Sequence, residues 1–290
     1  MAEKGRKMTE NRPVIALMYD FDKTLCTKDM QEYTFIPKVN MSPDAFWGQA
    51  IRLSQEKKMD PILAYMWLMI DKARSEHVSI HRENFVEMGQ DLELFPGVED
   101  WFKRIDEEGR AQGIEIEHYI ISSGLREIIE GSSVYGNFRD VFACEFYYDE
   151  NDVAVWPKNV VNYTTKTQFL FRINKGILDL SENSELNAYT PEEERRIPFE
   201  NMIYVGDGLT DVPCMKLVKV HGGYSIAVHK PGERAKVESL IRDGRVDFIT
   251  EADYTEGSEM DETVKRIIRG MAVRDGLRRQ SLAQLKSVSE

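Results

Sequence analysis

Two aspartates, Asp20 and Asp22, stand one residue apart directly after the short apolar run from Val14 to Tyr19. Such a run is typical of a buried strand. Alternate side chains of an extended chain point the same way, so both carboxylates are expected to face one point. They would repel by about 4 kcal/mol at about 4 Å and an effective dielectric constant of about 20. Because a cation or a proton relieves that repulsion, the pair predicts a metal-held nucleophile beside a proton donor. Taken alone, it is also compatible with solvated acids in a turn.

A second apolar run, Met202 to Val205, leads to Asp207, which stands between two glycines, and then to Asp211. Glycines permit a tight turn and a close backbone approach. Ligands of open α/β sheets bind at the carboxyl ends of the strands. We therefore expect Asp207 and Asp211 to meet Asp20 at one sheet edge, as an oxygen cage of the kind that Mg²⁺ prefers.

A third run, residues 118–121, ends in Ser122, Ser123 and Gly124, and a helix is expected to begin at Arg126. A small hydroxyl and the unpaired backbone N–H groups of a helix start suit an anion, phosphate above all. For Ser122 the alternative is a plain helix N-cap.

In this order, the three stretches resemble the motifs of the haloacid dehalogenase-like superfamily of phosphotransferases. The first motif of that family, D-x-D-x-T, is matched by Asp20, Asp22 and Thr24, its second by Ser122, and its fourth, G-D-x-x-x-D, by Gly206, Asp207 and Asp211. The resemblance extends over roughly residues 13 to 255.

The resemblance implies that Asp20 is the nucleophile, which becomes an aspartyl-phosphate, and that Asp22 is the acid and then the base. It implies a Mg²⁺ ion held by Asp20, the backbone carbonyl of Asp22, and Asp207, with Asp211 assisting. Ser122 would donate a hydrogen bond to the phosphoryl group.

The third motif of the family is a lone lysine, for which Lys158, Lys166 and Lys175 are candidates. We favour Lys166, because a cap at Thr165 would place it in the first turn of an amphipathic helix that faces the sheet edge. Its role would be to offset the charge of Asp20 and the phosphate.

Segment 94–98 and the position of the helical insert resemble the phosphoserine phosphatase branch. There, an acid seven residues after the second aspartate meets the amino group of the substrate. Asp29 holds this spacing and is one methylene shorter than the expected glutamate. The Ser-Gly-Gly of the branch is Ser122, Ser123 and Gly124 here, so Ser123 and Gly124 would lie beside the phosphate. Both departures leave the substrate open, and a solvated position is the alternative for Asp29.

Between the first and second motifs the pattern is helical. Helix starts are predicted at Ser42 and Asp60, each followed by proline, at Arg82, and after Gly97. In the resembled family this position holds a cap domain that closes over the site. Candidate clamps for a substrate carboxylate in it are Arg52, Arg74 and Arg82.

These patterns predict an α/β fold, a doubly wound and mostly parallel sheet with an inserted α-helical cap. The expected division is a polar N-terminal tail (1–12), a catalytic core (13–26 and 114–272), a helical cap (27–113) and a mobile or partly helical C-terminal tail (273–290). Residues 141–147 and 153–156 should form a hairpin, 223–228 and 246–249 later strands, and 176–200 a surface insertion.

The composition is ordinary for a globular protein, with 290 residues, 42% hydrophobic and 30% charged. A net charge of −12 argues against nonspecific binding to nucleic acid or an anionic membrane. Three scattered cysteines fit neither a disulfide framework nor a metal spacing, and no apolar run is long enough to cross a bilayer. A cytoplasmic location is expected, and the oligomeric state stays open.

The resulting hypothesis is a Mg²⁺-dependent phosphatase that hydrolyses a small phosphorylated metabolite, with an amino-acid-like phosphate as one candidate. A phosphotransferase or phosphomutase would use the same residues. A noncatalytic binding or regulatory protein that keeps the fold is the alternative of a different class.

Overall fold

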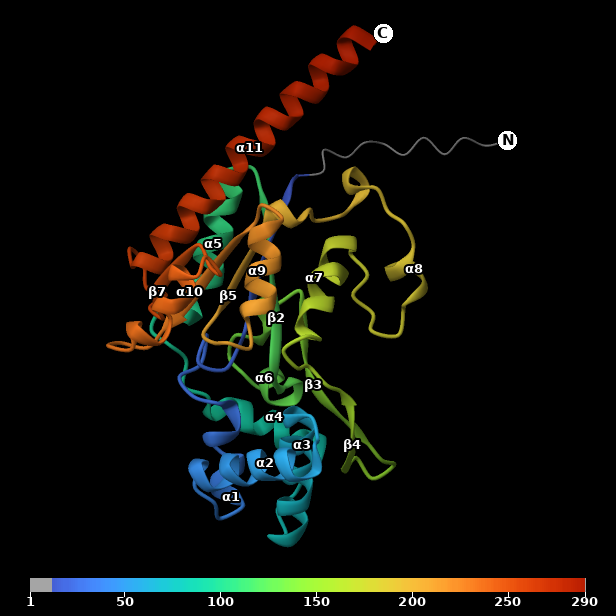
Figure 1. Cartoon of the computed structure of the whole chain (residues 1–290), viewed down its shortest axis with the longest axis vertical. Coiled ribbons are helices and arrows are strands. Elements are labelled where there is room, and N and C mark those ends of the chain that lie inside the picture. Colours follow the sequence, from blue (N-terminus) through green and yellow to red (C-terminus); the bar gives the residue numbers. More distant parts are fainter. Residues whose placement is uncertain (1–11, 290) are drawn as a thin grey trace.

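The computed structural model describes residues 12–289, so the predicted N-terminal tail lies, apart from Arg12, outside the described residues. Across this range seven strands form one sheet in the order β4-β3-β2-β1-β5-β6-β7 (Figure 1). In chain order the strands are β1 (Val14–Tyr19), β2 (Glu115–Leu125), β3 (Asp140–Tyr148), β4 (Ala154–Asn159), β5 (Met202–Gly206), β6 (Tyr224–His229) and β7 (Phe248–Glu251). Only the β3–β4 pair is antiparallel in this sheet, which confirms the predicted, mostly parallel α/β fold and the hairpin.

Strand β1 lies at the centre, with β2 on one side and β5 on the other. Tyr19 is level with Ile120 of β2 and with Val205 of β5. The chain order along the sheet reverses between β1 and β5, which is the switch point where doubly wound sheets bind ligands. The residues that follow these two strands therefore meet at the carboxyl edge.

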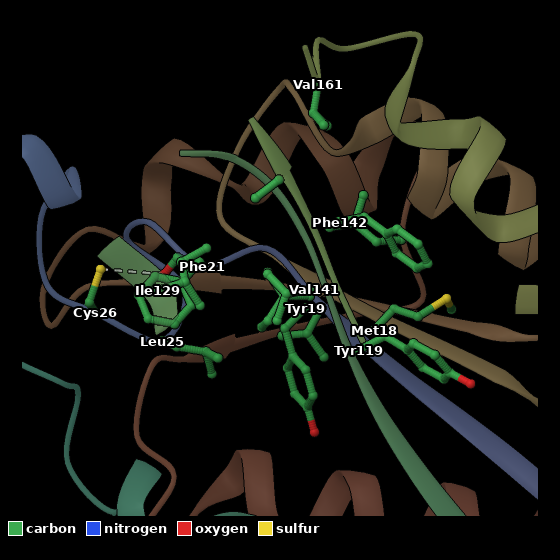
Figure 2. Packing of buried hydrophobic residues seen from close by; sticks show 14 of the residues in the cluster. Met18, Tyr19, Phe21, Leu25, Cys26, Tyr119, Ile129, Val141, Phe142 and Val161 are labelled. Atoms are coloured by element: carbon green, nitrogen blue, oxygen red, sulfur yellow. Dashed lines mark hydrogen bonds between the residues drawn. The ribbon is translucent and has the colours of Figure 1, made fainter. Parts of the chain in front are cut away.

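Helices cover both faces of the sheet. They are α5 (Val98–Ala111), α6 (Arg126–Glu130), α7 (Lys166–Lys175), α8 (Ser184–Asn187), α9 (Val212–Val220), α10 (Glu238–Arg242) and α11 (Glu259–Ser289). Figure 2 shows Met18 and Tyr19 directed to different sides of β1, as the alternation of a strand requires. Phe102 of α5 lies against Tyr19, with ring centroids 6.0 Å apart. On the other face Phe169 of α7 stacks on Phe142 at 4.6 Å.

A helical region follows the first motif and is drawn at the bottom of Figure 1. It contains α1 (Phe35–Lys38), α2 (Pro43–Lys57), α3 (Pro61–Ser75) and α4 (Arg82–Met88). The predicted starts of α2 and α3 are confirmed, because Ser42 accepts from the backbone of Ala45, and Asp60 from those of Ile62 and Leu63. Helix α2 packs on α3, α3 touches β4, and α4 packs on α6.

Two antiparallel segments join this region to the sheet. The amide of Thr27 donates to the carbonyl of Glu93, and the amide of Phe95 to that of Leu25, both at 2.9 Å. The next helix, α5, packs on β2 and α11, which belong to the sheet side of the molecule. The division into core and cap remains a prediction, and these contacts favour a boundary before Val98 over one at residue 113.

The C-terminal segment differs from its expected form. In place of a mobile or partly helical tail, residues 273–289 continue α11, which projects beyond the sheet (Figure 1). Arg269 donates two hydrogen bonds to Glu108 of α5, and Arg274 donates to the carbonyl of Gly222 at 3.2 Å. These contacts fix the middle of α11, and the later residues are mostly good helix formers.

The polar stretch 176–200 is a surface insertion folded back on α7. Arg172 donates to the carbonyls of Asp179, at 2.7 Å, and Glu182, at 3.1 Å. Among residues 12–289 no helix is long and apolar enough to cross a membrane. The cysteines, Cys26, Cys144 and Cys214, are buried and form no disulfide. The Cys26 thiol donates a hydrogen bond to the carbonyl of Phe21 at 3.5 Å (Figure 2).

Candidate active site

Asp20 directly follows β1, and its backbone amide donates to the carbonyl of Val205 at 2.9 Å. The chain then curls, because the carbonyl of Phe21 accepts from the amides of Leu25 at 2.9 Å and Cys26 at 3.1 Å. The turn covers residues 23–25, and Asp22 in front of it forms an isolated bridge with Cys26. The Asp22 carboxylate accepts from the amide of Met30 at 2.8 Å, at the start of the helical region.

Asp207 and Asp211 lie in the loop between β5 and α9. Gly206 ends β5 under the side chain of Asp211: a Cβ atom there would stand 2.5 Å from the Asp211 carboxyl carbon. Only glycine leaves that space, so Asp211 can be fully buried beside the strand end. Carboxylate oxygens of Asp20, Asp207 and Asp211 lie within 4.8 Å of one another, and that of Asp22 is not part of this group.

Of the three candidate lysines, Lys166 is the one that lies at these carboxylates. Its Nζ atom is 3.0 Å from Asp20 Oδ1 and 2.7 Å from Asp211 Oδ1. Lys158 instead pairs with Glu145 on the surface at 2.7 Å, and Lys175 donates to two backbone carbonyls of the insertion.

The start of α7 places Lys166 in the first helical turn, as expected, although Thr165 does not cap the helix. The side chain of Asn162 accepts from the amides of Thr164 and Thr165, at 3.2 and 3.0 Å. The Asn162 amide group also donates to Asp60 at 2.9 Å, and Asp60 caps α3. The lysine-bearing turn is thus tied to the helical region.

Ser122, Ser123 and Gly124 lie at the end of β2, where the register with β3 shifts between Ile121 and Leu125, and we call this irregular segment the β2 turn. Ser122 is fully buried, and its hydroxyl oxygen accepts from the amide of Gly124 at 3.0 Å, so the hydroxyl keeps its own hydrogen to donate. The Ser123 hydroxyl oxygen is buried without a partner within the described part of the chain. A Cβ on Gly124 would stand 2.1 Å from Met30 Cε and 2.9 Å from Asp22 Oδ2. Gly124 is therefore the close contact between this turn and Asp22.

The expected substrate contacts in the helical region have other partners. Asp29 forms an ion pair with Lys23 at 2.5 Å, so it is not a freely solvated acid. Arg82 pairs with Glu130 of α6. Arg52 and Arg74 are exposed on α2 and α3.

Two tyrosines also contact the site: Tyr204 was not singled out from the sequence, and Tyr65 belongs to a stripe, 65–69, that could line a pocket but whose pattern favours helix core. Tyr204 of β5 donates to Asp211 Oδ1 at 2.8 Å. Tyr65 of α3 donates to the carbonyl of Ser123 at 2.7 Å. A tyrosine inside the aliphatic run of β5 is a weak signal, and Tyr65 stood in a stretch that reads as helix core.

Burial is the largest influence on the pKa values of the ionisable groups at this site. It raises the pKa of Asp20 to about 6, although Lys166 lowers it, and the pKa of Asp207 to about 8, with the charges of Asp20 and Asp211 adding to the rise. Burial, Asp29 and Asp20 hold the pKa of Asp22 well above its usual value. For Lys166 burial acts to lower the pKa, but the two carboxylates it contacts raise it overall, so it remains an ammonium.

Comparison with known proteins matches this arrangement to one family. A model of the haloacid dehalogenase-like hydrolases matches residues 17–216. An uncharacterized protein of Borreliella burgdorferi is 29% identical over 282 residues, which is 87% of this chain and 96% of that protein.

Solved structures share the fold. A probable phosphoserine phosphatase from Vibrio cholerae is 12% identical with a TM-score of 0.57, over 91% of this chain and 67% of that one. A substrate-bound phosphoserine phosphatase is 14% identical with a TM-score of 0.54, over 87% and 97%. A HAD family hydrolase from Salmonella enterica serovar Typhi is 18% identical with a TM-score of 0.55, over 83% and 68%. At these identities the likeness concerns the fold, a parallel sheet with a helical region.

Proposed function

The chain belongs to the haloacid dehalogenase-like hydrolase family, and from this premise we propose that it is a Mg²⁺-dependent phosphatase of a small phosphomonoester. The observation that carries the proposal is the position of Asp20. It directly follows the central strand β1, and its carboxylate contacts Lys166 at 3.0 Å and lies within 4.8 Å of oxygens of Asp207 and Asp211.

The residues present fit a hard divalent cation. The donor set is all oxygen, and the raised pKa values of Asp20 and Asp207 mean that their charged forms lack sufficient compensation from Lys166 alone. We infer that Asp20, Asp207 and the backbone carbonyl of Asp22 hold Mg²⁺, with Asp211 assisting. When bound, the ion would supply positive charge opposite the phosphoryl oxygens.

The chemistry would divide between the first two acids. Asp20 would attack phosphorus in line while the bond to the ester oxygen breaks, and Asp22 would give its proton to the departing oxygen. Asp22 would then take a proton from water, which attacks the aspartyl-phosphate, releases inorganic phosphate and restores the Asp20 carboxylate. A pKa held high by burial, Asp29 and Asp20 keeps Asp22 protonated before the first step.

The phosphoryl group would be held by the β2 turn, Ser122 to Gly124, and by Lys166. Ser122 has a hydroxyl hydrogen to donate, and the buried Ser123 hydroxyl has no partner among the described residues. Lys166, fixed by Asp20 and Asp211, would offset the charge of the equatorial oxygens. Gly124, which has no side chain, leaves space beside the phosphoryl group. The ion pair of Asp29 and Lys23 would lie next to the leaving group.

Phosphate release from a panel of phosphorylated metabolites, with Mg²⁺ and with EDTA, tests the proposal. We expect Mg²⁺-dependent release by the natural chain, none by Asp20→Asn, and unchanged release by Asp44→Asn, an exposed aspartate of α2. Product analysis with an added acceptor alcohol would distinguish a phosphotransferase from a phosphatase. Release that is unaffected by Asp20→Asn would refute the nucleophile assignment.

A further inference from the structure

A hollow of about 230 Å³ adjoins the carboxylate group on the β6 side. Its position follows from the sheet: Gly206 of β5 is level with Ala227 of β6, so the residues after each strand face one another. Asp207 therefore forms part of its wall. The charged side chains that line the hollow are Lys23, Asp207, His229, Lys230, Glu233 and Lys236. We call it the lysine pocket.

A tight turn fixes one wall of the lysine pocket. The amide of Glu233 donates to the carbonyl of Lys230 at 3.0 Å. Pro231 and Gly232 occupy the middle of the turn, and Gly232 has a φ of 76°, which a type II turn requires and which glycine adopts without strain. The turn holds Lys230 at the mouth of the hollow.

His229 lines the lysine pocket and carries a nitrogen without a partner in the described chain. Its side chain is 8% exposed, and its Nδ1 atom lies 2.9 Å from the carbonyl of Lys230. Because a carbonyl only accepts, Nδ1 must carry the hydrogen. The other nitrogen, Nε2, is buried without a partner in the described chain. Buried polar atoms without partners are rare, so this imidazole is a polar group beside the hollow that the fold leaves unsatisfied.

Each ammonium group of the lysine pocket either forms no ion pair among the described residues or is held by a partially exposed partner. Lys236 pairs with Glu233 at 2.7 Å, but its side chain is 69% exposed. Lys23 pairs with Asp29 at 2.5 Å and is 40% exposed. Exposed pairs of this kind contribute little and exchange readily. With Asp207 engaged by a cation, the lining would hold three lysines and one acid, Glu233, in a chain whose net charge is −12, while Asp29, outside the lining, pairs with Lys23.

We propose that the lysine pocket binds a second anionic group of the substrate, so that the substrate class is phosphomonoesters that also carry a carboxylate or another phosphate. The inference rests on the proposed function, because the first phosphate is taken to lie at Asp20. Asp207 belongs both to the carboxylate group and to the wall of the lysine pocket. One small molecule can therefore reach the two sites at once.

Binding to the Asp20→Asn chain with Mg²⁺ tests this by calorimetry, without turnover. The ligand pairs are 3-phosphoglycerate against glycerol 3-phosphate, for a carboxylate, and fructose 1,6-bisphosphate against fructose 6-phosphate, for a second phosphate. We expect the member with the second anionic group to bind about tenfold more tightly in at least one pair, the usual scale of a charge-assisted contact. Which pair shows the difference identifies the anion.

Two variants read out the lysine pocket itself. Joint substitution K230A/K236A should abolish the preference, whereas K216A, which removes an exposed lysine of α9 outside the hollow, should retain it. Equal binding within both pairs, no binding at all, or a preference that survives K230A/K236A would overturn the inference. Absence of Mg²⁺-dependent phosphate release by the natural chain from every member of the metabolite panel would instead count against the proposed function.

Discussion

Lys166 and Asp211 form a fully buried ion pair, with Nζ and Oδ1 2.7 Å apart and neither side chain exposed. The same ammonium contacts Asp20, and the same carboxylate oxygen accepts from Tyr204 at 2.8 Å. Burial of charges is tolerated only when their partners are in place, because removal of one partner leaves the other uncompensated. The pair therefore connects the stability of the chain to the geometry of Asp20.

Lys166→Met should lower the free energy of unfolding by about 3 kcal/mol at neutral pH and abolish phosphate release, since Asp211 and Asp20 lose their shared cation. Lys158→Met is the matched control: Lys158 is 56% exposed and pairs on the surface with Glu145, so its loss should cost less than about 1 kcal/mol. Urea denaturation measures both. Equal stability of the two variants would contradict the role given to the buried pair.

The sequence predicts the parts of the site that lie at strand ends. Asp20, Asp207 and Ser122 each follow an apolar run, and parallel strands bring their carboxyl ends to one edge. The strand-end pattern does not predict Lys166. Its choice over Lys158 depended on a predicted helix start, and it is the ion pairs in the structure that distinguish the two lysines.

What the sequence could not provide depends on long-range contacts. Tyr65 reaches the carbonyl of Ser123, 58 residues away, and Asn162 reaches Asp60 over 102 residues. Neither has a local pattern that differs from ordinary core or loop. The length of α11 was missed for a related reason: its last part shows propensity without apolar periodicity, which a window of hydrophobicity does not detect.

Magnesium binding should release protons. At pH 7 the pKa of about 8 leaves Asp207 protonated in the metal-free chain, and the pKa of about 6 leaves Asp20 mostly charged. Binding of Mg²⁺ at pH 7 should thus release about one proton, and the apparent affinity should rise with pH up to about 8. Calorimetry in two buffers of different ionisation enthalpy counts the protons. Heats that do not depend on the buffer would exclude the coupling.

Metal-free stability should depend on pH in the opposite sense. The pKa of Asp207 rises from 3.8 to about 8 on folding, so the folded chain binds the extra proton. The contribution of this group is fully present below pH 3.8 and is lost as the pH rises through 8. The melting temperature in EDTA should therefore decrease between pH 6 and about 8 relative to Asp207→Asn, which lacks the titrating group. Parallel pH profiles of the two chains would argue against a raised pKa at Asp207.

Gly124→Ala should impair activity more than folding. The added Cβ would stand 2.1 Å from Met30 Cε and 2.9 Å from Asp22 Oδ2. The flexible Met30 side chain can move, but it is then pressed into the site, and the contact with the Asp22 carboxylate remains. We expect a stability loss of about 1–3 kcal/mol and at least tenfold lower kcat. Gly136→Ala, with nothing within 4 Å of its Cβ, is the control. Met30→Ala should partly restore kcat in Gly124→Ala, and no rescue would mean that the steric account is wrong.

Tyr65→Phe tests whether the helical region positions the phosphate-binding turn. The phenol donates to the carbonyl of Ser123 at 2.7 Å, so its loss frees the turn while the ring keeps its packing against Trp47, 5.8 Å away. We expect kcat/KM to fall by about tenfold, with about 1 kcal/mol lost in stability. Tyr163→Phe, at an exposed tyrosine, should change neither quantity. If Tyr65→Phe lowers stability but leaves kcat/KM at the natural value, the contact supports the fold alone, and the turn is positioned from the sheet side by Ser122 and Gly124.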